Sequence, residues 1–257
     1  MLSKIEGSIG YLIFNNPEKH NAVSLEMWDA TDAILDEFES NPDVRVVVLT
    51  GAGGKSFVSG ADISKFEKER GSAEATKHYN ARIRAIYERI DQFPKPTIAQ
   101  VDGYCIGGGL NLAVCCDIRI CSSKSKFAMP AAKLALGYPF PAIQRLINAI
   151  GASNAKYLMF TAERIDADTA YRVGFVQSVH DESALEQEVA ALANQIGSNA
   201  PLTVKAMKFI ATQVLIDPNN RDLAHCDALV DACFNSEDYK EGRTAFMEKR
   251  APQFKGC

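Results

Sequence analysis

Short apolar runs rich in β-branched residues alternate with longer amphipathic segments over the first two thirds of the chain. Five such runs stand out, at residues 11–16, 44–50, 96–103, 117–123 and 125–130. Their length and their flanking turn residues predict buried strands. Between the first two, residues 24–40 have helical spacing and open with Ser24, a residue that favours the N-cap position. The alternation predicts a layered α/β core.

The pattern changes near Asn199. Residues 200–215, 221–236 and 236–252 all have helical spacing, and no strand pattern lies between them. We therefore predict an α/β core over residues 1–198 and a helical C-terminal region over residues 199–257. A helical region of this size buries little surface by itself. We expect it to pack on the core, on another subunit, or on both.

Composition narrows the classes of function. The chain has 257 residues, 47% of them apolar, and a net charge of −4, which disfavours nucleic acid as a partner. The first residues, MLSKIEGSIGYLIF, are too short and too mixed for a signal peptide. No apolar run approaches the roughly 18 residues of a membrane span. We expect a cytoplasmic protein that does not bind membranes.

Cysteine and histidine spacing predicts no metal site. The seven cysteines are odd in number and include no C-x-x-C pair, so the pattern suggests neither zinc ligation nor a disulfide framework. We expect reduced and mostly buried thiols. The four histidines form no H-x-x-x-H or H-E-x-x-H motif, which disfavours a metal hydrolase.

Two glycine-rich segments carry the candidate chemistry. GAGGKSFVSGADIS (Gly51–Ser64) and GYCIGGGLNLA (Gly103–Ala113) each follow a predicted strand and lead into a helix pattern. Glycine lets a ligand approach the backbone closely, and N–H groups at a helix start favour negative charge. Two such turns side by side would aim two N–H donors at one oxygen, as in an oxyanion hole. Neither segment matches a P-loop or a dinucleotide-binding fingerprint.

Several motifs together resemble one family. NNPEKHNAVS, GKSFVSGADI, PKPTIAQVDGYCIGGGLNLAVCCDIRI, FAMP and SEDYKEGRTAFMEKRAPQF are similar to the enoyl-CoA hydratase/isomerase (crotonase) superfamily, in its order and spacing. The resemblance implies the crotonase fold of repeated β-β-α units, with a helical trimerisation region. It also implies homotrimers, often paired into hexamers. No cofactor is implied, because coenzyme A enters as part of an acyl-CoA substrate.

The resemblance also assigns roles to residues. The backbone N–H groups of Ala61 and Gly108 would hold the thioester carbonyl and stabilise an enolate, and Ser59–Ser64 would pass along the adenine and pantetheine. Phe246 and Lys249 match positions that contact coenzyme A, in some relatives from a neighbouring subunit. The full substrate-binding set is Ser59, Ala61, Asp62, Ile63, Ser64, Gly107, Gly108, Ala131, Phe246 and Lys249.

The chain departs from the family's hydratases at two positions. The resemblance places their two glutamates where this chain has Asn111 and Ala131. The stretch from Ile118 to Ala162 contains no Asp or Glu at all. An amide cannot act as a base near neutral pH, and alanine has no polar group. The sequence therefore disfavours the two-glutamate hydratase mechanism and a one-acid isomerase at either position.

Decarboxylation of a malonyl-type thioester makes the enolate without a base, so a decarboxylase or an atypical lyase is favoured. Asn111 and Tyr138 join Ala61 and Gly108 as catalytic candidates. Tyr104 and Lys133 are further polar candidates. In relatives the segment after Ala61 can form a flap over the acyl group, and its acidic and histidine residues are also candidates: Asp62, Glu67, Glu69 and His78. Asp62 fits a residue bonding its own turn. The alternatives are an acyl-CoA-binding homologue without activity, and a hydrolase using Cys105, whose thiol fits a buried structural role better.

Overall fold

The computed structural model describes residues 1–257. Its larger sheet has six strands in the order β1-β2-β3-β5-β7-β10. Only β1 and β2 pair antiparallel, and every other neighbouring pair is parallel. In chain order the six strands span Leu2–Glu6, Ile9–Phe14, Val46–Gly51, Thr97–Val101, Ile118–Ser122 and Ser178–His180.

A second sheet has four short strands in the order β4-β6-β8-β9, of which the sequence predicted only β8, within residues 125–130. These strands span Ser56–Val58, Tyr104–Ile106, Lys126–Ala128 and Ile165–Asp166. The sequence predicted that each glycine-rich turn runs directly into a helix, whereas β4 and β6 come first. They pair in parallel, with Ser56 opposite Tyr104 and Val58 opposite Cys105. This pairing brings the two glycine-rich segments together.

Ten α-helices surround the sheets, and Ser24 caps the first of them, as predicted, by accepting from the N–H of Met27. Helices α1 to α5 span Leu25–Ser40, Phe66–Arg70, Ala73–Asp91, Gly108–Cys115 and Phe140–Thr161. Helices α6 to α10 span Ala167–Arg172, Leu185–Gly197, Pro201–Val214, Leu223–Phe234 and Glu237–Glu248. Short 3₁₀ turns span Pro17–Lys19, Ile63–Lys65, Pro130–Leu134 and Pro218–Asn220.

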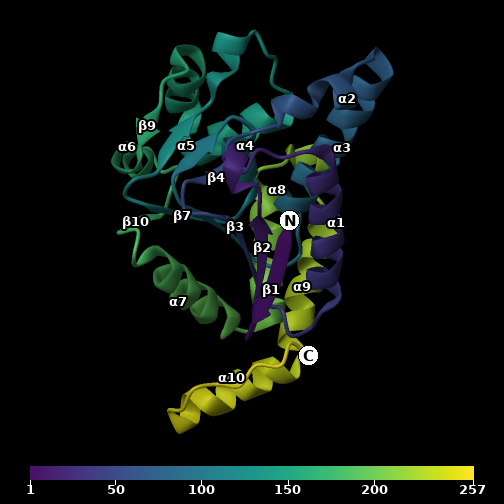
Figure 1. Ribbon diagram of the computed structural model, residues 1–257. Coiled ribbons are helices and arrows are strands. Elements are labelled where there is room, and N and C mark those ends of the chain that lie inside the picture. Colours follow the sequence, from purple (N-terminus) through teal and green to yellow (C-terminus); the bar gives the residue numbers. More distant parts are fainter.

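The inner strands β2, β3, β5 and β7 of the larger sheet are buried on both faces, which explains their continuous apolar runs, whereas the edge strand β1 is exposed. Val46 and Val48 of β3 pack in one cluster with Leu185 and Val189 of α7. Val47 and Leu49, which point to the other face, belong to a larger core shared with α1, α3, α4 and α5. Figure 1 shows α7 on one side of the sheet and α1 on the other.

The C-terminal region is helical, as predicted, and contains no strand. An ion pair joins the C-terminal region to the core: the ammonium group of Lys208 in α8 lies 2.7 Å from a carboxylate oxygen of Asp117, the residue before β7. Helix α10 extends below the rest of the molecule, with the C-terminus beside its start (Figure 1). Asp238 holds that end of the chain by accepting from the N–H groups of Lys255 and Gly256, both at 2.7 Å.

Candidate active site

The two glycine-rich segments meet at Gly60 and Gly108. A Cβ built on Gly108 would lie 3.4 Å from the Cα of Gly60, and one built on Gly60 would lie 3.6 Å from the nitrogen of Gly108. Both distances are ordinary van der Waals contacts, so the two backbones lie directly against each other. The two glycine-rich segments therefore lie side by side, as the oxyanion-hole hypothesis requires.

The N–H of Ala61 points away from Val23, the residue that hydrogen-bonds to its segment. Val23 pairs with Ala61 in a single parallel bridge. In it, the N–H of Val23 donates to the carbonyl of Gly60 at 2.8 Å, and the N–H of Asp62 donates to the carbonyl of Val23 at 3.0 Å. A parallel bridge of this kind uses the groups flanking Ala61 and leaves its own N–H on the opposite side. That N–H donates to no loop or cap carbonyl.

Gly108 is the first residue of α4, so its N–H is one of the donors that a helix start leaves without an intrahelical partner. The preceding Gly107 has φ 57° and ψ −111°, a conformation that side chains rarely adopt. Its N–H donates to the carbonyl of Ala128 at 2.8 Å, which fixes the turn to β8. Two free N–H groups, one each from Ala61 and Gly108, thus lie on adjoining segments.

Asn111 lies in the first turn of α4 and is 4% exposed. Its side-chain oxygen Oδ1 is buried without a hydrogen-bond partner. An unpaired buried polar atom is costly in a folded protein and calls for an explanation, such as a ligand or a water molecule. Asn111 is therefore available to bind a group placed beside Gly108.

Tyr87 of α3 is a residue that the sequence did not single out. Its hydroxyl donates to the carbonyl of Gly108 at 3.0 Å, and burial raises its pKa well above the usual value. The donation fixes the start of α4 against α3. The sequence signal is weak, because Tyr87 looks like any other apolar-face position of an amphipathic helix.

Tyr138 lies on the other side of the same turn. A Cβ built on Gly107 would be 3.7 Å from its hydroxyl oxygen. Burial raises the pKa of Tyr138 to about 12, so this hydroxyl keeps its proton near neutral pH. The structure therefore brings together Ala61, Gly108, Asn111 and Tyr138, the four residues that the sequence nominated for catalysis.

Comparison with known proteins identifies the family of this arrangement. The sequence model described as Enoyl-CoA hydratase/isomerase matches residues 4–257. The chain belongs to that family. It is 38% identical to the short-chain-enoyl-CoA hydratase of Clostridium acetobutylicum, over 95% of this chain and 93% of that one. It is also 35% identical to the (E)-benzylidenesuccinyl-CoA hydratase of Thauera aromatica, over 99% and 98% of the two chains.

Solved structures of the family confirm the crotonase fold. An enoyl-CoA hydratase/carnithine racemase from Magnetospirillum magneticum superposes with a TM-score of 0.92 at 33% identity, covering 99% of this chain and 95% of that one. An enoyl-CoA hydratase from Bacillus anthracis gives a TM-score of 0.93 at 31% identity, covering 100% and 99%. Members of the family act on acyl-CoA thioesters.

Asp62 is committed to its own turn. Its carboxylate accepts from the N–H and the hydroxyl of Ser64 and lies 3.0 Å from the ammonium group of Lys19. The hydrogen bonds from Ser64, followed by Lys19, hold the pKa of Asp62 below its usual range. Ser59 donates to the carbonyl of Lys19 at 3.3 Å, while Ile63 is exposed. The proposed coenzyme A contacts of Ser59–Ser64 stay a prediction.

Other polar candidates have partners elsewhere. Lys133 donates to the carbonyl of Ala162 at 3.1 Å, and Tyr104 packs edge-on against His20. Cys105 is fully buried, and burial raises the pKa of its thiol well above the usual value. A thiol that stays protonated is a poor nucleophile. Ala131 lies half-buried in the 3₁₀ turn Pro130–Leu134.

Phe246 and Lys249 do not join this site within one chain. They lie at the end of α10, which is at the far end of the molecule from α4 (Figure 1). The side chain of Phe246 is 82% exposed. Their contact with coenzyme A therefore requires a second subunit and remains a prediction.

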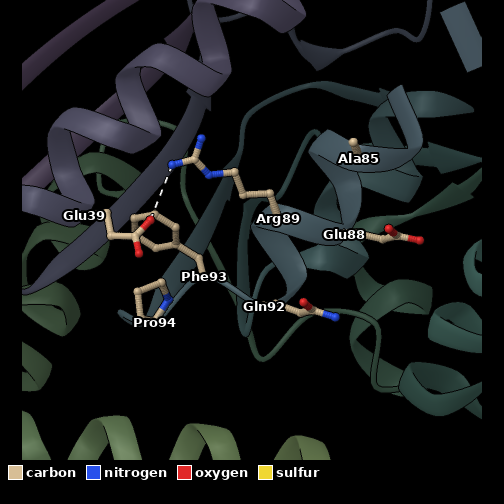
Figure 2. Close-up of a pocket in the computed structure, with 7 residues that line it drawn as sticks. All are labelled: Glu39, Ala85, Glu88, Arg89, Gln92, Phe93 and Pro94. Atoms are coloured by element: carbon tan, nitrogen blue, oxygen red, sulfur yellow. Dashed lines mark hydrogen bonds and ion pairs between the residues drawn. The ribbon is translucent and has the colours of Figure 1, made fainter. Parts of the chain in front are cut away.

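A surface hollow between α1 and α3 offers no catalytic alternative. Figure 2 shows Arg89 directed at Glu39 across it, beside Phe93 and Pro94. The guanidinium group of Arg89 also pairs with Asp32 and Asp36, so it ties α3 to α1. The structure contains no cluster of three or more His, Cys, Asp or Glu side chains that could hold a metal ion. None of the helices is long and apolar enough to cross a membrane.

Proposed function

We propose that this chain is an acyl-CoA enzyme that forms an enolate without a glutamate base, by decarboxylating a malonyl-type thioester. The observation that carries the proposal is Asn111. By the family resemblance it occupies a glutamate position of the hydratases, and here it supplies a buried amide oxygen without a partner. Ala131 occupies the second such position. Neither side chain can remove a proton from water.

Decarboxylation needs no base. The bond between the α-carbon and the carboxylate breaks, carbon dioxide leaves, and the electron pair moves onto the thioester oxygen. The N–H groups of Ala61 and Gly108 would stabilise that oxyanion. Losing one such donor typically costs about 3 kcal/mol of transition-state stabilisation. The α-carbon then takes a proton, for which the hydroxyl of Tyr138 is our candidate donor.

The test mixes the purified protein with methylmalonyl-CoA and, separately, with crotonyl-CoA, and follows the products by mass spectrometry. We expect methylmalonyl-CoA to lose the mass of carbon dioxide. The Gly108→Pro variant lacks the N–H and should be about 100-fold slower. Gly108→Ala keeps the N–H and serves as the matched control. Its Cβ would be at ordinary contact distance from Gly60 and 3.1 Å from the hydroxyl of Tyr87, which must move by a few tenths of an ångström.

If crotonyl-CoA gains the mass of water at a rate typical of the family, the proposal is wrong, and the acids of α2 become the candidates for the catalytic acid and base.

The second candidate function is an acyl-CoA-binding homologue without activity. The same lack of acidic side chains at positions 111 and 131 favours it. Binding of both thioesters without any product would support this candidate over the decarboxylase.

A further inference from the structure

The N–H of Gly108 lies within a run of three glycines, Gly107 to Gly109. Glycine has more backbone freedom than any other residue. A donor stabilises an oxyanion well only if its direction is fixed before the charge forms. The peptide group between Gly107 and Gly108 therefore needs contacts from other residues that hold it in place.

One contact comes from the helix that the glycines begin. The N–H of Asn111 donates to the carbonyl of Gly107 at 3.1 Å. The peptide bond between Gly107 and Gly108 is trans, so the N–H of Gly108 points in the opposite direction, out of the start of α4. This hydrogen bond lies within α4 and does not fix where the helix start lies relative to Ala61.

The second contact comes from Tyr87 of α3. Its hydroxyl donates to the carbonyl of Gly108 at 3.0 Å, and it also forms a hydrogen bond with the side chain of Asn111. Because the hydroxyl proton goes to Gly108, the amide group of Asn111 is the donor in the second bond. One hydroxyl thus holds both the residue that carries the oxyanion donor and the buried amide beside it.

The ring of Tyr87 is itself held in place by packing. Tyr87 is 9% exposed, and its ring meets that of Trp28 edge-on, with the ring centres 5.3 Å apart. Trp28 lies in α1 and is 3% exposed. A side chain whose rotamer is locked by its neighbours can fix the groups that it bonds. The hydroxyl of Tyr87 is therefore a rigid anchor, from a different helix, for a flexible run of glycines.

We propose that Tyr87 is a positioning residue of the oxyanion hole, which sets the direction of the Gly108 N–H and the place of Asn111. It acts through these two groups and needs no contact with the substrate. The inference rests on the part of the proposed function in which Ala61 and Gly108 bind a thioester carbonyl, and it does not depend on decarboxylation. Loosening one donor should weaken stabilisation of the enolate more than binding of the substrate.

The first test measures the infrared carbonyl band of butyryl-CoA, isotopically labelled at the thioester carbon, free and bound. This probe has no carboxylate to lose, so the band reports on the oxyanion hole in the absence of a reaction. Two aligned N–H donors polarise the carbonyl and move its band to lower wavenumber. We expect this displacement in the wild type and a smaller one in Tyr87→Phe, which keeps the ring and lacks the hydroxyl. A merely structural hydroxyl would affect stability and leave the band in place.

Tyr79→Phe is the matched control, because Tyr79 is also a buried tyrosine of α3 and lies about 12 Å along the helix axis from Tyr87. It should leave the band unchanged. Replacing Tyr87 with para-aminophenylalanine puts an amino donor in the place of the hydroxyl and should restore most of the displacement. This second variant tests the proposal even if Tyr87→Phe does not fold. The same band in Tyr87→Phe as in the wild type would overturn the proposal.

Turnover of methylmalonyl-CoA separates this inference from the proposed decarboxylation. We expect Tyr87→Phe to lower kcat about tenfold, which is less than the loss of a whole donor, and to change KM by less than about twofold. If the band depends on Tyr87 but no carbon dioxide is released, the decarboxylase is wrong and the role of Tyr87 stands. If carbon dioxide is released and Tyr87→Phe leaves both kcat and the band unchanged, the role of Tyr87 is wrong and the decarboxylase stands. A wild-type band without displacement would also overturn the role of Tyr87, because the N–H groups would then not bind the carbonyl.

Discussion

The hydroxyl of Tyr138 is suited to give a proton and unsuited to take one. Burial raises its pKa to about 12, so it is neutral at any pH where the protein would be assayed. We predict that Tyr138→Phe slows product formation from methylmalonyl-CoA by about 100-fold, the lower end for general acid catalysis. The wild-type rate should also show no titration from this group between about pH 6 and pH 9. Unchanged kcat in the variant would assign the proton to another donor.

Gly109 is required for packing and not for chemistry. A Cβ there would overlap the carbonyl oxygen of Val58 on β4, and backbone cannot move aside as a flexible side chain can. We predict that Gly109→Ala lowers the free energy of unfolding by about 3 kcal/mol, measured by urea denaturation. Gly137→Ala is the control, because nothing lies within 4 Å of a Cβ at that position. Equal stability of the two variants would contradict this account.

At the scale of single residues, the sequence predicted those whose role depends on the residues next to them in the chain. The two glycine-rich segments were identified by their composition, the family resemblance assigned Ala61 and Gly108 within them, and the structure brings these segments together. Tyr87 was not identified. Its significance depends on what its hydroxyl contacts in the folded chain. No spacing rule in one sequence carries that information.

Helix α4 is held at both ends by other elements. Its start is fixed by Tyr87, and its end by Arg119 of β7, a residue 7% exposed. The guanidinium group of Arg119 donates to the carbonyl of Cys116 at 2.7 Å, next to the last residue of α4, and to that of Phe175 at 2.6 Å. A cation at this position satisfies carbonyls that a helix end leaves without partners and complements its dipole.

We predict that Arg119→Met lowers the free energy of unfolding by about 3 kcal/mol, because at least two buried carbonyls lose a charged donor. The measurement is the urea midpoint followed by circular dichroism. Arg172→Met is a suitable control, since Arg172 is an exposed arginine whose side chain forms a single hydrogen bond, to Thr169. A change in Arg119→Met no larger than in the control would show that water replaces the guanidinium group.

Elements of different length were predicted with different success. The long helices of the C-terminal region and four strands of the larger sheet, β2, β3, β5 and β7, follow their sequence patterns, whereas β1 and β10 were not predicted. The three-residue strands β4 and β6 lie inside glycine-rich turns, and so short a segment shows no alternation to detect. Each is a strand because it pairs with a strand distant in the sequence, so its formation depends on tertiary contacts.

Across the whole molecule, buried thiols and phenols make the fold sensitive to alkali. Burial raises the pKa of both Cys116 and Cys121 to about 12 from its ordinary value of 9.0. The folded state therefore holds these protons after the unfolded chain has released them. The stabilisation is complete below about pH 9 and is lost as pH rises from there through about 12.

We predict that the urea midpoint is constant from pH 7 to 8.5 and falls steeply by pH 10.5. Each of the two thiols should account for about 2 kcal/mol of the loss by then, from 1.36 kcal/mol for each pH unit. Cys121→Ala should reduce the slope of this fall, whereas Cys257→Ala, which removes an exposed thiol, should not. The same slope in all three proteins would assign the alkaline loss to other groups.

The surface of the C-terminal region predicts self-association. Phe246 and Met247 of α10 are 82% and 79% exposed, and further large apolar side chains are exposed on α8 and α9, namely Met207, Val214, Leu223 and Phe234. Exposed apolar groups of this number and size favour a protein partner. A second copy of the chain would cover them, and it would also carry Phe246 and Lys249 toward a neighbouring active site.

We predict a trimer or a dimer of trimers by light scattering coupled to gel filtration. Phe246→Glu combined with Met247→Glu should shift the mass toward the monomer, because association would then bury two charges without partners. Lys240→Ala, an exposed change on the same helix, should leave the mass as it is. If Phe246 contacts coenzyme A from a neighbour, the double variant should also weaken acyl-CoA binding. Dissociation with full affinity would confine Phe246 to assembly, and a wild-type monomer would contradict the prediction itself.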